Sequence, residues 1–146
     1  MIGITSTLSG NGELIFSADG KVRMKALTHA ALTAKTPYRI IWNEYGPVTT
    51  TIADDVHYFY VCVPEKDIDS GEVAELQIGG LVEDMITPSL SMEVGHAFKI
   101  FDGAVADVGS DYSGAAGEFG VAVTATAVAS TTQDCFLVPI QIIGTT

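Results

Sequence analysis

The sequence DSGEVAELQIGGLVED, residues 69–84, contains a strand, a glycine pair and a second strand-like piece. Acidic side chains occur along it, but neither a histidine nor a basic residue accompanies them. Acid–base and nucleophilic sites need partners of those kinds within hydrogen-bond reach. The stretch therefore predicts well-formed β-structure that carries no catalytic pattern of its own.

Short strand patterns recur along the whole chain. In KVRMKAL, residues 21–27, apolar residues alternate with Lys21, Arg23 and Lys25, which predicts a half-buried strand with a basic outer face. Residues 28–36 fit either a short helix or an extended connector, and residues 87–95 fit a helical turn. Further strands are expected at residues 38–42, 48–52, 56–63, 72–78, 96–101, 104–108, 119–128 and 135–143. This pattern predicts an all-β barrel or sandwich with at most one or two short helices.

Glycines mark the predicted turns between these strands. Asp102-Gly103 separates two strand patterns and is a strong hairpin signal. Gly71, Gly95 and Gly117 each stand just before an apolar run and a predicted strand. Glycine supplies the positive φ that such turns need, so ordinary turn chemistry accounts for the recurrence.

Charge is unevenly distributed over the 146 residues, whose net charge is −11. Residues 1–39 have a balance of +3, and residues 40–146 have a balance of −14 with only Lys66 and Lys99 as bases. An acidic body repels phosphate, so no nucleic-acid partner is expected. A basic leading segment suggests an arm, residues 1–36, that lies on an acidic surface of the body, residues 37–146, of a neighbouring copy or of another protein. The alternative is a basic surface strand with no partner. The candidate contacts in this arm are Leu14, Ile15, Phe16, Lys21, Arg23 and Lys25.

The N-terminus lacks the basic and apolar regions of a secretory signal. The longest nearly apolar run, residues 135–143, is too short to span a bilayer, so no membrane partner is expected. Cys62 and Cys135 each lie in an apolar strand pattern, which favours buried reduced thiols; they could pair only if their strands are neighbours.

Patterns for catalysis, cofactors and metals are missing from the sequence. Asp54, Asp55 and His57 come nearest to a metal cluster but lack a second histidine or cysteine at ligand spacing. Residues 65–72, EKDIDSGE, resemble an acidic calcium loop whose glycine and bidentate glutamate positions are wrongly filled. No nucleophile elbow or phosphate-binding loop occurs. We therefore expect a protein that is not an enzyme, with no catalytic residues, no cofactor and no bound metal.

Aromatic residues offer an alternative function. They could form a platform for sugars, although core packing also explains them. The residues are Tyr38, Trp42, Tyr45, Tyr58, Phe59 and Tyr60.

The second half of the chain resembles the head-decoration, or capsid cement, proteins of tailed bacteriophages. The resemblance rests on three stretches within residues 69–143: DSGEVAELQIGGLVE, SMEVGHAFKIFDGAVADVG and GEFGVAVTATAVASTTQDCFLVPIQ. The first is similar to that family's Gly-Glu strand, the second to its turn, strand and hairpin, and the third to its closing strands. Phe98-Lys99-Ile100 departs from the family pattern, in which a tryptophan or tyrosine is often found.

The resemblance implies a small β-tulip-like barrel or sandwich with an extended N-terminal arm. It implies a homotrimer that binds the major capsid protein on the outer surface of an icosahedral virion head, after synthesis in the host cytoplasm. It implies no catalysis. A carbohydrate-binding or adhesion module on a β-barrel scaffold is the alternative.

Overall fold

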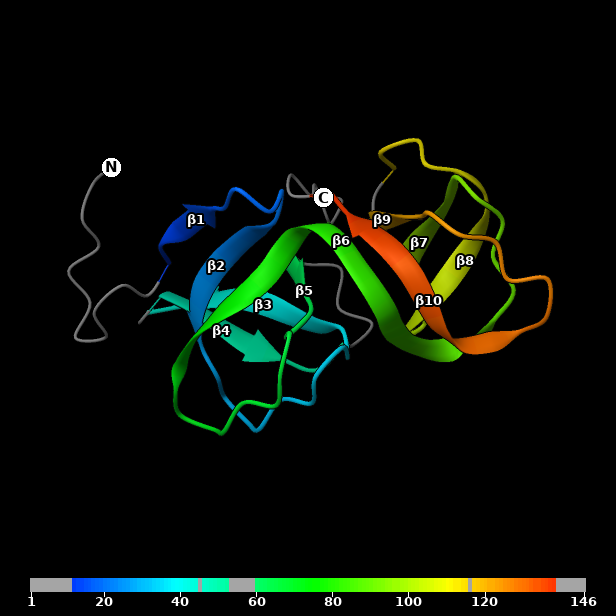
Figure 1. The fold of residues 1–146 in the computed structure, drawn as a ribbon. Helices are drawn as coiled ribbons and strands as arrows, with labels where there is room; N and C mark the ends of the chain where they lie inside the picture. The colour runs from blue at the N-terminus through cyan, green and yellow to red at the C-terminus, as the bar shows by residue number, and fades with distance from the viewer. Residues whose placement is uncertain (1–11, 45, 53–59, 116, 139–146) are drawn as a thin grey trace.

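The computed structural model describes residues 12–44, 46–52, 60–115 and 117–138. These residues form a sheet of 10 strands and no helix (Figure 1). The strands are β1 (Leu14–Phe16), β2 (Val22–Leu27), β3 (Tyr38–Asn43), β4 (Gly46–Thr50), β5 (Tyr60–Cys62), β6 (Val73–Leu90), β7 (His96–Phe101), β8 (Ala104–Asp111), β9 (Glu118–Ala122) and β10 (Ser130–Leu137). The predicted all-β fold class is thus confirmed.

The strands follow the order β5-β3-β4-β2-β6-β10-β9-β7-β8, and β1 pairs with β2 outside this path. All pairings are antiparallel except that between β2 and β4, where Leu27 lies opposite Val48. The described strands do not close into a barrel, so the architecture is sandwich-like.

Strand β6, which contains most of the opening sequence stretch, joins the two groups of strands. Its first part, Val73 to Gly79, pairs with β2, and its second part, Gly80 to Leu90, pairs with β10. Figure 1 shows β6 running from the group with β1–β5 to the group with β7–β10. The glycine pair therefore marks a change of partner strand within one continuous strand of 18 residues.

Each group of strands has its own hydrophobic core. The first core contains Met24, Ala26, Leu32, Ile40, Cys62, Ile68, Leu76 and Ile78. The second contains Val61, Val63, Val82, Met85, Met92, Phe98, Val105, Phe119, Ala122, Cys135 and Leu137. Strand β5 and Val63 after it contribute to both, because successive residues of an extended chain point to opposite faces.

The two cysteines are buried free thiols, as the sequence predicts. Cys62 belongs to the first core and Cys135 to the second, so no disulfide joins them. Burial raises the pKa of both thiols above its usual value, which keeps them protonated. Cys135 packs directly on Gly120, where any added Cβ would collide with its sulfur.

The backbone of β6 comes unusually close to the β1–β2 connection at Gly80. A methyl group on Gly80 would lie 2.7 Å from the carbonyl oxygen of Gly20 and 3.1 Å from the Cα of Lys21. Gly80 also has a φ of +91°, a conformation that L side chains rarely adopt. Only glycine therefore allows the β1–β2 connection to rest on β6 at this point.

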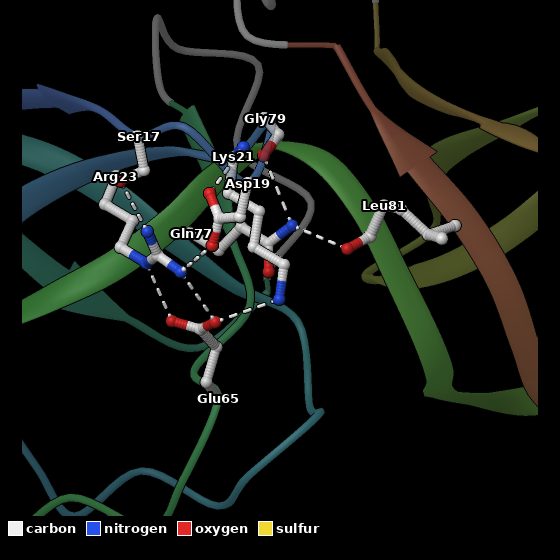
Figure 2. A network of polar contacts seen from close by, with 8 residues as sticks. All are labelled: Ser17, Asp19, Lys21, Arg23, Glu65, Gln77, Gly79 and Leu81. Atoms are coloured by element: carbon white, nitrogen blue, oxygen red, sulfur yellow. Dashed lines mark hydrogen bonds and ion pairs between the residues drawn. The ribbon is translucent and has the colours of Figure 1, made fainter.

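Gln77 supports the same point of β6. Its side chain is only 1% exposed, and its Nε2 donates to the carbonyl oxygens of Gly79 (3.2 Å) and Leu81 (2.9 Å) (Figure 2). Burying an amide that makes no hydrogen bond would destabilise the fold. Here the buried amide of Gln77 instead donates to two backbone carbonyls at the point where β6 changes its partner strand.

Turn predictions hold where the turn is local. Asp102 and Gly103 both have positive φ, and they connect β7 to β8 with Phe101 opposite Ala104. Gly71, Gly95 and Gly117 also have positive φ just before strands β6, β7 and β9. The predicted hairpin and the three predicted turn glycines are confirmed.

Three predicted elements differ from the structure. Residues 87–90 belong to β6 instead of a helical turn, because β10 pairs with them. The predicted strand 119–128 ends at Ala122, because Thr126 exchanges hydrogen bonds with Met92 and holds the following residues as a loop. Strand β10 begins at Ser130, five residues before the predicted start at Cys135. Of the two options for residues 28–36, the structure has the extended connector, bridged from Leu32 to Ile68.

The predicted boundary between an arm and a body falls after residue 36. Residues 22–27 nevertheless form β2, which pairs with β6 and buries Met24 and Ala26 in the first core. The clean alternation that predicted a half-buried strand thus makes this part of the predicted arm an integral strand of the sheet. Residues 1–11 lie outside the described residues, so an arm there stays a prediction.

Replacing Gly80 by alanine should destabilise the fold strongly. Gly71→Ala is the matched control, because Gly71 has a similar φ of +84° but no atom within 4 Å of an added Cβ. The control should cost about 1–2 kcal/mol, the strain of a left-handed alanine. Gly80→Ala should cost a further ~1–3 kcal/mol from the backbone clash. Urea unfolding of both variants measures the difference, and equal losses would show that the contact with Gly20 does not constrain the fold.

Candidate contact surface

The predicted contact residues lie on the hairpin formed by β1 and β2. Leu14, Ile15 and Phe16 of β1 lie opposite Met24, Arg23 and Val22 of β2. Every residue of β2 pairs with β6 on one edge. Strands β1 and β4 therefore share the other edge of β2. The hairpin is therefore attached to the sheet through β2 and braced against β6 at Gly80.

Arg23 is the centre of a polar network on the outer face of the hairpin (Figure 2). Its Nε and Nη2 donate to the two carboxylate oxygens of Glu65 at 2.9 and 3.0 Å. Nη2 also donates to Asp19 (3.0 Å), and Nη1 donates to the hydroxyl of Ser17 (2.7 Å). This bidentate arrangement suits the planar guanidinium and fixes its direction.

The two neighbouring lysines are also paired within the chain. Lys21 Nζ donates to Glu65 (3.1 Å), and Lys25 Nζ donates to Glu13 (3.1 Å). Glu65 follows β5, so Lys21 and Arg23 lie on an acidic group of their own body. Of the three acidic surfaces that the charge distribution allowed, the structure shows contacts to this one.

Protonation of the network is shifted toward the charged forms. Hydrogen bonds from Arg23, and then from Lys21, lower the pKa of Glu65 from 4.5 to about 2 against the opposing effect of burial. The backbone N–H of Lys21, followed by Arg23, also lowers the pKa of Asp19. The pKa of Arg23 is raised by the same carboxylates, Glu65 first. The network is thus ionised at neutral pH.

The apolar side chains of β1 have a different environment. Leu14 and Phe16 are 45% and 76% exposed. They share a sheet face with Met24 and Val22, their register partners, which belong to or pack against the first core. The apolar face of the sheet therefore continues onto β1, where the described residues leave Leu14 and Phe16 partly exposed. Ile15 points to the opposite face with Arg23 and is half-buried.

The histidines and acidic groups do not assemble a metal site among the described residues. His96 lies between Glu93 (Nε2 to Oε2, 3.4 Å) and Asp107 (Nδ1 to Oδ1, 3.3 Å), and His29 is exposed. Asp54, Asp55 and His57 lie outside the described residues. In the loop that resembles a calcium site, Glu65 binds Arg23, and Asp67 accepts from the N–H of Ala34 (2.8 Å).

The structure describes three of the six aromatic candidates, Tyr38, Trp42 and Tyr60. Trp42 is 51% exposed and packs against Tyr60 with a ring-centroid distance of 5.8 Å and an interplanar angle of 54°. The hydroxyl of Tyr38 accepts from the N–H of Thr33 (2.9 Å). Tyr45, Tyr58 and Phe59 lie outside the described residues. The described part of the platform is thus one exposed indole beside one phenol.

Two carboxylates, Glu65 and Glu118, anchor parts of the fold in a way that the sequence did not reveal. Glu65 anchors the basic face from 42 residues away, a separation that no local pattern reveals. Glu118 is buried and accepts from the N–H of Ser113 and the N–H of Ala115, so it organises the loop before β9. Glycines at 114 and 117 marked that loop as a turn but gave no sign of its anchor.

Comparison with known proteins gives one structural similarity. No protein-family model and no curated protein sequence matches the chain. The chain is similar to the crystal structure of the head fiber gp8.5 N base of bacteriophage phi29. The sequence identity is 16%, the match covers 84% of this chain and 98% of that chain, and the TM-score is 0.49. The resemblance to head-decoration proteins stays a sequence-based prediction, because no family model supports it. Among the described residues, no helix has the length and apolar character needed to cross a membrane.

Stability should depend on pH through Glu65. Its folded-state pKa of about 2 lies below the ordinary value of 4.5, so ionised Glu65 stabilises the fold above about pH 4.5. This contribution is lost as the pH falls toward 2. Wild type should exceed Glu65→Gln in free energy of unfolding by on the order of 1 kcal/mol at pH 7, as expected for partly exposed pairs. Denaturation from pH 7 to 2 measures the gap, and a gap that does not narrow in acid would contradict this assignment.

Proposed function

We propose that this chain is a structural protein of a bacteriophage virion that binds the outside of the icosahedral head as a homotrimer and stabilises the shell. Its partners would be the major capsid protein and further copies of itself. The resemblance of residues 69–143 to head-decoration proteins supports this class of function. The acidic balance of −14 over residues 40–146 favours a protein partner over nucleic acid.

The observation that carries the proposal is the exposed apolar surface of β1. A single exposed apolar residue is normal, but here two stand on one strand that continues a core face. The hairpin beneath them is held by the Arg23 network and by the contact at Gly80. A rigid support with an apolar, uncovered strand has the character of a protein contact surface.

Binding to the head should depend on the apolar residues of β1 more than on the basic ones. Exposed ion pairs contribute about 0.2–1 kcal/mol, and those of Lys21 and Arg23 are already made within the chain. Phe16→Asp should therefore weaken binding to heads that lack this protein by at least tenfold, since burying a large apolar side chain contributes about 1.5–3 kcal/mol. Lys21→Ala should change binding less than threefold.

Val128→Asp is the control, because Val128 is also exposed, at 80%, and lies in the loop between β9 and β10. Co-sedimentation of full chains with undecorated heads measures binding, and particle images of decorated heads locate the protein. Absence of the wild-type protein from the head surface would overturn the proposed function. Equal binding by Phe16→Asp and Val128→Asp would exclude β1 as the contact.

A second candidate function is a carbohydrate-binding or adhesion module. The half-exposed Trp42, supported by Tyr60, favours it, because exposed aromatic rings can stack on sugars. A glycan screen with wild type and Trp42→Ala discriminates the two functions. Glycan binding that disappears in Trp42→Ala would establish this alternative, and no binding by wild type would exclude it.

A further inference from the structure

Strand β1 has one edge that no other described strand covers. Glu13 accepts from the N–H of Lys25, and the N–H of Ser17 donates to Lys21, so these residues direct their backbone groups toward β2. In an antiparallel ladder alternate residues point to opposite edges, so Leu14 and Phe16 direct theirs away from β2. Among the described strands, β1 pairs with β2 alone. The edge beyond Leu14 and Phe16 is thus a template for one more strand.

Strand β8, which lies at one end of the strand order, is chemically different. Strand β8 carries Asp107 and Asp111, and Gly109 interrupts it with a φ of +79°. Charges and irregular backbone protect sheet edges from unwanted pairing. Strand β1, in contrast, has the uninterrupted sequence Leu-Ile-Phe with no charged side chain. The edge at β8 is thus protected by charge and backbone irregularity, whereas the edge of β1 that faces away from β2 has neither protection among the described residues.

The sequence of residues 1–12 suits this edge. It contains no charged side chain, whereas residues 40–146 carry a balance of −14 and would repel each other between copies. Ile2 and Ile4 have the spacing of Leu14 and Phe16, so the four side chains can share one face of a paired ladder. The eleven residues before Gly12 can extend roughly 36 Å, enough to reach a neighbouring molecule.

A separate copy fits the edge better than a tight hairpin of the chain's own N-terminus does. A two-residue hairpin turn within residues 9–12 would place odd-numbered residues opposite even-numbered ones. A turn at residues 10 and 11 would set Thr7 against Leu14 and Thr5 against Phe16, and it would direct the isoleucines to the other face. A strand from another copy has no such constraint on register.

We infer that the open edge of β1 binds residues 2–8 of a second copy as an added strand. The inference concerns the hydrogen-bonding edge of β1, beside the apolar face that the proposed function assigns to contact with the head. It names how the copies of the proposed homotrimer join, and it rests on the proposed function to that extent. Main-chain hydrogen bonds to Leu14 and Phe16 supply affinity, and the facing isoleucines supply specificity. Each copy donates one strand and accepts one, which is a heterologous contact that closes into a ring when the rotation permits. A ring of three copies is the homotrimer.

Self-association of the full chain, without any heads, tests the inference. Sedimentation velocity over a range of concentrations should show wild type and Val128→Asp associating with the same midpoint. Two variants should each raise the concentration at which half of the chains associate by at least tenfold. Phe16→Asp blocks the acceptor edge, and a deletion of residues 2–8 removes the donor strand. Circular dichroism confirms that both variants retain the β-fold.

Complementation separates strand exchange from general apolar attraction. The Phe16→Asp chain keeps a donor strand, and the deleted chain keeps an acceptor edge, so an equimolar mixture should form a one-to-one complex that neither forms alone. Wild type that stays monomeric at all concentrations, or a mixture that forms no complex, would overturn the inference. Wild type that self-associates but does not bind heads would leave the inference standing and remove the proposed function.

Discussion

The close approach of β6 to the β1–β2 connection at Gly80 is the constraint on which the remaining arrangement depends. It requires a residue without a side chain, in a conformation that favours glycine. Beside it β6 exchanges β2 for β10 as its partner, so two separate cores share one strand. Gln77 satisfies the carbonyls of Gly79 and Leu81 at the same place. The backbone contact at Gly80 and the buried amide of Gln77 together fix the position of the β1–β2 hairpin on the sheet.

The position of the hairpin in turn determines its chemistry. With β2 paired to β6, the outer face of β2 lies beside the loop that follows β5, and Glu65 meets Arg23 and Lys21 there (Figure 2). These charges are used within the chain and are partly exposed to water, so they offer a partner little further attraction. What remains available on the hairpin is apolar side chain and backbone. This division explains why a basic segment on an acidic body need not recruit its partner by charge.

Local patterns predicted the local parts of this fold. Alternation in residues 21–27 predicted β2, and Asp102-Gly103 predicted the β7–β8 hairpin, because both depend on neighbouring residues alone. The continuity of β6 through two glycines could not be predicted, since it depends on β2 and β10, far apart in the sequence. The loop after Ala122 was hidden for the same reason: its β-prone residues are held out of the sheet by hydrogen bonds between Thr126 and Met92. At the candidate surface, the apolar and basic residues of the hairpin were recognisable, whereas the partner Glu65 was not.

An open apolar strand edge is a liability unless it has a defined partner. Sheet proteins usually cover, charge or distort such edges, and this chain does so at β8 with two aspartates and a glycine. Charged side chains that could protect the edge of β1 are also present nearby, at Glu13 and Asp19. Those carboxylates instead pair with Lys25 and Arg23 of β2 and leave Leu14 and Phe16 uncovered. Retention of an unprotected edge on a braced hairpin therefore supports the inference that this edge is used for pairing.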